Sequence, residues 1–64
     1  MKLGRKSIFK TFSVNGTEIT IHADKQFRIC NLLPKIENQS QYYGRQINDE
    51  SVISQILADY ESRL

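Results

Sequence analysis

The sequence predicts a small α+β domain: an N-terminal antiparallel β-hairpin, or a three-stranded meander, then a short helical segment and a C-terminal amphipathic helix. Two observations carry this prediction. Residues 7–23 form two β-rich runs joined by an Asn-Gly pair, and residues 48–64 carry apolar side chains at helical spacing. The 64 residues contain no repeat, linker or low-complexity tract, so we expect a single domain over 1–64.

The hairpin follows from its turn. Asn-Gly supplies the positive φ that a two-residue type I′ turn requires. Such a turn fixes the register, so partner numbers sum to 31: Val14 faces Thr17, and Ile8 faces Ala23. One face of the hairpin is then mostly apolar. The opposite face is a surface for contact that carries Phe9, Thr11, Ser13, Glu18, Thr20 and His22.

Residues 24–33 allow two interpretations. A short helix with Asp24 as its N-cap is favoured by three apolar residues spaced by three, Phe27, Cys30 and Leu33. In that helix Cys30 is a small core residue. The alternative is a second turn at Asp24 and Lys25, followed by a third strand. Pro34 ends either element, because proline lacks an N–H and disfavours α geometry in the residue before it.

The remaining elements are helical. Residues 35–43 fit one or two turns closed by Gly44. The last helix is capped by Asn48 or Asp49, and Arg63 lies at its end, where positive charge is favoured. Its apolar stripe is wide for so short a chain. We therefore predict a homodimer whose interface contains Val52, Ile53, Ile56, Leu57 and Tyr60.

Composition excludes several classes of protein. One cysteine cannot form an intramolecular disulfide, and no spacing of His and Cys indicates a metal site. No apolar run approaches the roughly 20 residues of a membrane span, and we expect a cytoplasmic location. A lone histidine, one cysteine and isolated serines do not assemble a nucleophile with its base. We expect no catalytic activity and no cofactor.

The net charge of +2 is unevenly distributed. Residues 1–32 sum to +4 and the second half to −2, and residues 1–6 form a basic arm that we expect to be frayed. A basic, strand-bearing half suits a polyanionic partner. The candidate nucleic-acid contacts are Lys2, Arg5, Lys6, Thr20, His22, Arg28 and Arg45.

The order of three segments resembles the ribbon-helix-helix DNA-binding proteins, the class of the Arc and methionine repressors. These segments are TEITIHA (17–23), a helical stretch from Asp24, and GRQINDESVISQILADY (44–60). The resemblance implies an intertwined homodimer whose paired strands enter the major groove. It also implies base-reading positions at Glu18, Thr20 and His22, and backbone amides near Asn48 close to a phosphate.

Charge pattern and resemblance together predict a small DNA-binding protein without catalysis. The expected role is that of a phage or plasmid transcriptional regulator, a repressor that binds double-stranded DNA as a dimer. The modest net charge favours an alternative, a protein-binding module that inhibits or adapts another protein.

Overall fold

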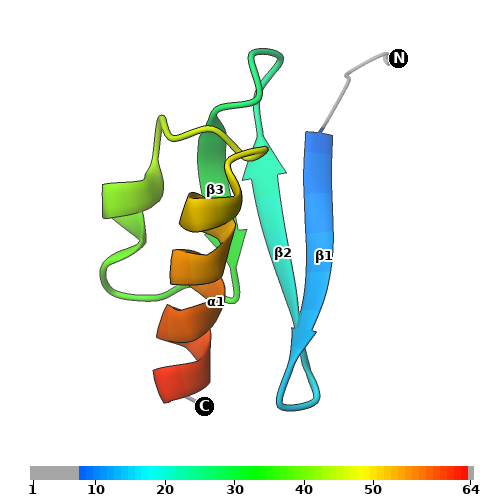
Figure 1. The fold of residues 1–64 in the computed structure, drawn as a ribbon, viewed down its shortest axis with the longest axis vertical. Helices are drawn as coiled ribbons and strands as arrows, with labels where there is room; N and C mark the ends of the chain where they lie inside the picture. Colours follow the sequence, from blue (N-terminus) through cyan, green and yellow to red (C-terminus); the bar gives the residue numbers. More distant parts are fainter. Residues whose placement is uncertain (1–7, 64) are drawn as a thin grey trace.

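The computed structural model describes residues 8–63 as a three-stranded antiparallel sheet with a helix on one face (Figure 1). The sheet is a meander of β1 (Ile8–Val14), β2 (Thr17–Ala23) and β3 (Ile29–Leu33). A 3-10 turn, η1 (Gln39–Tyr42), precedes the helix α1 (Glu50–Arg63). The α+β prediction is confirmed in its meander form.

The register of the hairpin is confirmed along its whole length. Ile8 pairs with Ala23, and Val14 pairs with Thr17, with each intervening pair as the two-residue turn requires. Asn15 has φ 51° and Gly16 has φ 80°, both in the left-handed region that a type I′ turn needs. The turn sequence therefore determines which side chains of β1 and β2 share a face.

The core lies between the inner face of the sheet and α1. The inward side chains of β2 and β3 are buried except Thr17, whereas Thr17 and all four inward positions of β1 are only half-buried. The buried cluster also includes residues of η1, the segment before α1, and α1 itself. Its members are Ile19, Ile21, Ala23, Ile29, Leu32, Tyr42, Ile47, Val52, Ile56 and Tyr60.

The predicted helix over residues 24–33 is wrong, and the alternative third strand is correct. A register shift pairs Ala23 with Ile29 but His22 with Asn31, so Cys30 is an additional residue in β3. This irregularity puts Ile29 and Leu32, three residues apart, on the same inner face. Consequently Phe27, Cys30 and Leu33 are exposed, and Cys30 is not the core residue that we expected.

The outer edge of β3 is covered by the segment leading to α1. The Ile29 amide donates to the Arg45 carbonyl (2.8 Å), the Gly44 amide to the Ile29 carbonyl (2.9 Å), and the Ile47 amide to the Phe27 carbonyl (2.8 Å). Gly44, which follows η1, has φ 86° as expected for a closing glycine. One edge of the sheet is thus occupied by the protein's own chain.

Helix α1 is capped and amphipathic as predicted. The Asp49 carboxylate accepts a hydrogen bond from the Ser51 amide (3.0 Å). Of the stripe assigned to a dimer interface, Val52, Ile56 and Tyr60 point into the protein's own core, and Ile53 and Leu57 are half-buried. Most of that stripe is used within one copy. No helix among residues 8–63 is long and apolar enough to cross a membrane.

Candidate nucleic-acid interface

The face of the sheet opposite α1 is the open face, which the described residues leave accessible. It carries the exposed Phe9, Thr11, Ser13, Glu18 and Leu33, and the half-buried Thr20, His22 and Asn31. Hydroxyl, imidazole and amide groups predominate, and Glu18 is the one formally charged side chain among these. Such uncharged groups are able to donate hydrogen bonds to base edges and to accept hydrogen bonds from them.

An aromatic pair orders one end of this face. Phe9 and His22 are directly opposite in the register, and their ring centroids are 5.9 Å apart with an interplanar angle of 41°. On the other side of His22, the register places Asn31 opposite. A ring flanked in this way has restricted rotamers.

The connection from β2 to β3 is a rigid loop, which we call the β2–β3 tip (residues 24–28). The Asp24 carboxylate accepts hydrogen bonds from the backbone amides of Gln26 (2.9 Å) and Arg28 (3.0 Å). The backbone closes the loop twice more: the Asp24 amide donates to the Arg28 carbonyl, and the Phe27 amide to the Asp24 carbonyl, both at 3.0 Å. Phe27 adopts φ 64°, a conformation that is strained for a non-glycine residue.

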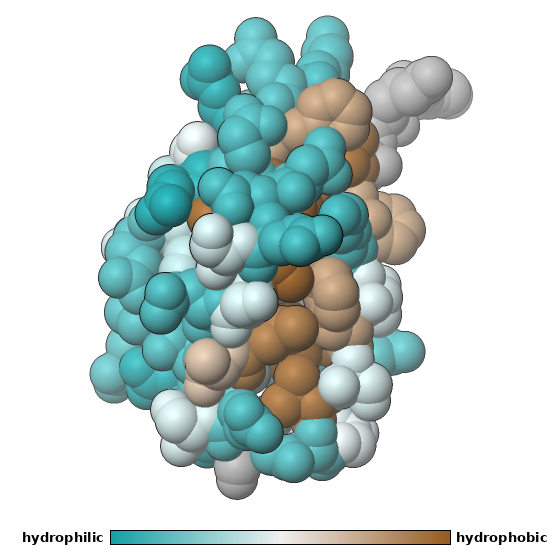
Figure 2. Space-filling view, in the orientation of Figure 1, coloured by the Kyte–Doolittle hydropathy of each residue, from teal (hydrophilic) through white to brown (hydrophobic). Residues whose placement is uncertain are grey.

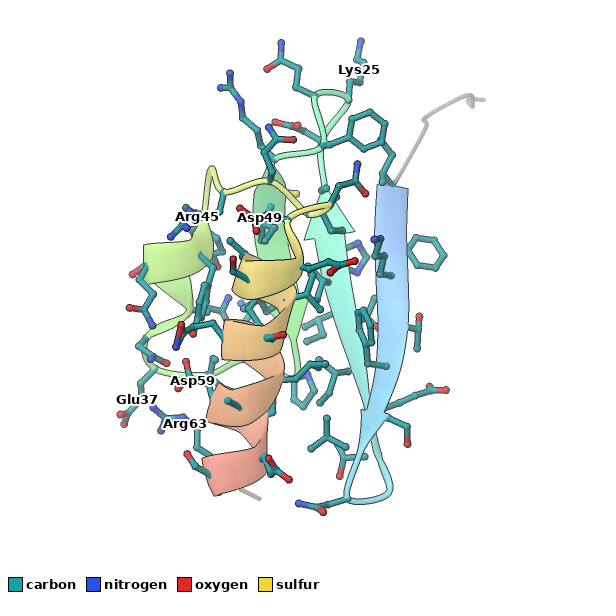
Figure 3. The ribbon with its side chains drawn as sticks, in the orientation of Figure 1. Lys25, Glu37, Arg45, Asp49, Asp59 and Arg63 are labelled. Carbon is teal, nitrogen blue, oxygen red and sulfur yellow. The ribbon has the colours of Figure 1, made fainter. Side chains whose placement is uncertain are left out.

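The tip presents positive charge. Lys25 extends from it away from the sheet (Figure 3), and Arg28 lies at its junction with β3. The one acid in the tip, Asp24, is turned onto the loop's own amides. The Arg28 amide hydrogen bond holds the pKa of Asp24 below its ordinary value, and this carboxylate remains ionised with its charge partly satisfied by the loop.

The predicted basic arm begins at the same end of the molecule. Lys2, Arg5 and Lys6 lie outside the described residues, but they precede Ile8, which pairs with Ala23 next to the tip. Because these are three of the nine basic residues, residues 8–63 hold six Lys and Arg against seven Asp and Glu. Of these six cations, Lys25 and Arg28 lie in the tip, together with the acid Asp24.

The structure separates the predicted contact residues into two groups. Thr20 and His22 share the open face, whereas Arg28 lies in the tip, where its amide donates to Asp24 and its backbone forms a bridge with Gln46. Arg45 instead lines a shallow depression of about 80 Å³ on the helix side, together with Tyr42, Ser51, Val52 and Gln55 (Figure 3). A single surface therefore does not contain all the residues that were predicted to contact nucleic acid.

A second hollow, of about 390 Å³, lies between the hairpin turn and α1. Its lining combines Val14, Leu57 and Ala58 with short polar groups and Glu61. Figure 2 shows apolar surface in this region between α1 and the hairpin. Among residues 8–63, no three His, Cys, Asp or Glu side chains converge as metal ligands.

Sequence reasoning missed two features of the interface. Asn31 faces outward beside His22 because of the extra residue in β3, and an apolar spacing of three concealed that irregularity. The positive φ of Phe27 has no sequence signature, since glycine or asparagine is the usual residue in that conformation.

Comparisons with family models, curated proteins and solved structures found no match to this chain. They neither support nor refute the resemblance to ribbon-helix-helix proteins. In the structure, the segment that this resemblance would make the first helix forms β3 and η1.

Proposed function

We propose that this protein binds double-stranded DNA without catalysis, through the β2–β3 tip and the adjoining part of the open face. The observation that carries the proposal is the rigid, cationic tip. It projects beyond Ile8, the first described residue of β1, and leads directly into outward polar side chains. We include in this proposal a regulatory role of the phage or plasmid type, and a cytoplasmic location suits a chain with one exposed thiol.

The dimensions of the tip suit the major groove. This groove is about 12 Å wide and admits a two-stranded β-ribbon. Near the tip, β2 and β3 form such a ribbon, with strand axes about 4.8 Å apart. Only residues 24–28 project beyond β1, which begins at the level of Ala23. His22 and Thr20 pair with Phe9 and Thr11 of β1, so their contacts with base edges require the end of the three-stranded sheet to lie against the groove.

The residues in the tip and those beside it have distinct expected roles in DNA binding. Lys25 and Arg28 contact phosphates, and Lys2, Arg5 and Lys6 extend the same backbone contact. His22 and Thr20 contact base edges, because they lie on the open face behind the cations. The negative charge of Asp24 repels phosphates only weakly, because its carboxylate accepts two backbone hydrogen bonds.

The test compares cations on two surfaces. Binding of a fluorescent duplex is measured by anisotropy from about 50 to 200 mM salt. Arg28→Ala should weaken binding to every sequence and flatten the salt dependence by about one unit. Arg45→Ala removes the same charge from the helix side, so it should have a much smaller effect. Thr20→Ala should alter sequence preference and leave the salt slope unchanged.

Equal effects of Arg28→Ala and Arg45→Ala would contradict the assignment to the tip, since only general electrostatics would then be acting. No binding to any duplex at low salt would contradict DNA binding itself. That result would favour the protein-binding alternative. The candidate surface for a protein partner is the hollow between α1 and the hairpin, which the half-buried Leu57 lines.

A further inference from the structure

Within the described part of the chain, strand β1 is an unpaired sheet edge whose one protective charge is Lys10. The strand order β1-β2-β3 leaves one side of β1 without a neighbour among residues 8–63 (Figure 1). Its seven residues contain one charged side chain, Lys10, and neither a proline nor a bulge. Proteins usually blunt a long edge with such features, because unpaired backbone groups are a template for another strand.

The register identifies the unpaired groups. In a two-residue hairpin the closing pair, Val14 and Thr17, exchanges both backbone hydrogen bonds, and hydrogen-bonded pairs then alternate along the strands. The N–H and C=O groups of Phe9, Thr11 and Ser13 therefore point toward the free edge. A partner must supply an extended backbone with the same spacing.

We propose that β1 pairs antiparallel with β1 of a second copy of this chain, with Thr11 directly opposite the partner's Thr11. This register is the one that uses all seven residues of both strands. It is self-complementary, as a two-fold dimer interface must be. On the inner face it places Ile8 against the partner's Val14, and Lys10 against the partner's Phe12.

Incomplete burial of β1 favours a second copy as the partner. Its inward residues, Ile8, Lys10, Phe12 and Val14, are all half-buried, whereas the inward residues of β2 other than Thr17 are buried. In the proposed register the partner's Ile8 lies beside Val14, which lines the 390 Å³ hollow with Leu57. The stem of Lys10 covers the partner's aromatic ring while its ammonium stays in solvent.

The pairing stops at two copies. On the opposite edge of the sheet, Phe27 and Ile29 are hydrogen-bonded to the segment from Gly44 to Ile47, so a further copy does not find that edge open along its whole length. A two-fold contact through β1 uses the remaining edge on both molecules. The expected product is a closed dimer with a six-stranded sheet, not a fibre.

The dimer geometry also bears on DNA, and this step rests on the proposed function. Thr11 is three residues from Ile8, and the tip extends about two more, so each tip lies ~16 Å from the two-fold axis along the strands. It lies ~10 Å from that axis across the strands. The two tips then point in opposite directions and lie roughly 35–40 Å apart, so one duplex meets both of them only along the shared open face of the dimer. Their separation is close to the ~34–36 Å between half-sites one DNA turn apart.

Crosslinking tests the register directly. Thr11→Cys is made with Cys30→Ser, so that the new thiol has no competitor. Facing Thr11 residues are expected about 5.5 Å apart at Cα, within the range that a disulfide spans. Mild oxidation should give a covalent dimer in high yield. The matched control, Thr20→Cys with Cys30→Ser, places a thiol on the same face of β2 and should crosslink weakly.

Thr11→Pro tests the backbone pairing. Its amide points away from β2, so the substitution removes no hydrogen bond within one copy, but removes both central bonds between copies. Light scattering at about 100 μM should show a dimer for the parent and a monomer for Thr11→Pro, with circular dichroism confirming that the variant is folded.

A monomeric parent, or equal crosslinking through Thr11→Cys and Thr20→Cys, would overturn the proposed pairing. A dimer that crosslinks through Thr11→Cys but binds no duplex would support the pairing and refute the DNA-binding function. If both proposals hold, paired half-sites about 10–11 base pairs apart should bind more tightly than half-sites offset by five base pairs.

Discussion

Substitution of Gly16 by valine tests the physical basis of the hairpin. Gly16 has φ 80°, and a Cβ added there would meet no heavy atom within 4 Å. The substitution therefore introduces no clash, and its cost comes from forcing a β-branched residue into the left-handed region. That cost is about 1–2 kcal/mol. For a domain of this size it corresponds to a decrease of roughly 5–15 °C in Tm.

Thermal and urea unfolding followed by circular dichroism measure this effect. The urea midpoint should fall while the m-value is unchanged, because the surface exposed on unfolding is the same. Asn15→Gly is the matched control: it keeps a residue that tolerates positive φ at the adjacent turn position, so its effect should be small. An unchanged midpoint for Gly16→Val would refute the turn assignment, and with it the register that defines the open face.

Two further predictions concern the core. Ile56→Glu should unfold the protein, because Ile56 is fully buried, whereas Leu57→Glu should leave a folded chain, because Leu57 is half-buried. Circular dichroism distinguishes the two outcomes. Equal effects of the two substitutions would contradict the packing of α1. Burial, followed by the hydrogen bond to Asp59, raises the pKa of Tyr42 to about 12. Unfolded tyrosine ionises near pH 10, so this contribution to stability is complete below about pH 10 and is lost as the pH rises toward 12. Tyr42→Phe should reduce that alkaline loss in pH-dependent unfolding, and an identical pH profile would exclude Tyr42 as its source.

The hairpin was predictable from sequence because its constraint is local. A two-residue Asn-Gly turn determines the pairing of Ile8 through Ala23, so no distant contact is needed to define the faces. Helix α1 was predictable for a similar reason. Its cap at Asp49 and its apolar period are both contained in 15 residues.

The segment after the hairpin was not predictable in the same way. Strand β3 depends on the extra residue at Cys30 and on hydrogen bonds from Ile29 to Arg45, and these contacts are distant in the sequence. An apolar spacing of three occurs in both a helix and an irregular strand, so periodicity alone does not distinguish them. The candidate site was divided for the same reason: Arg45 belongs to the covering segment on the helix side, not to the open face.

The most direct measurement is a titration of the isotopically labelled protein with duplex DNA, observed through backbone amide NMR shifts. We predict that the largest shifts occur over residues 22–31, at the β2–β3 tip and the adjoining strand ends, and that they diminish as salt is raised. Amides on the exposed side of α1 should change little. Shifts confined to α1 and the hollow beside Leu57, or no shifts at low salt, would contradict DNA binding through the tip.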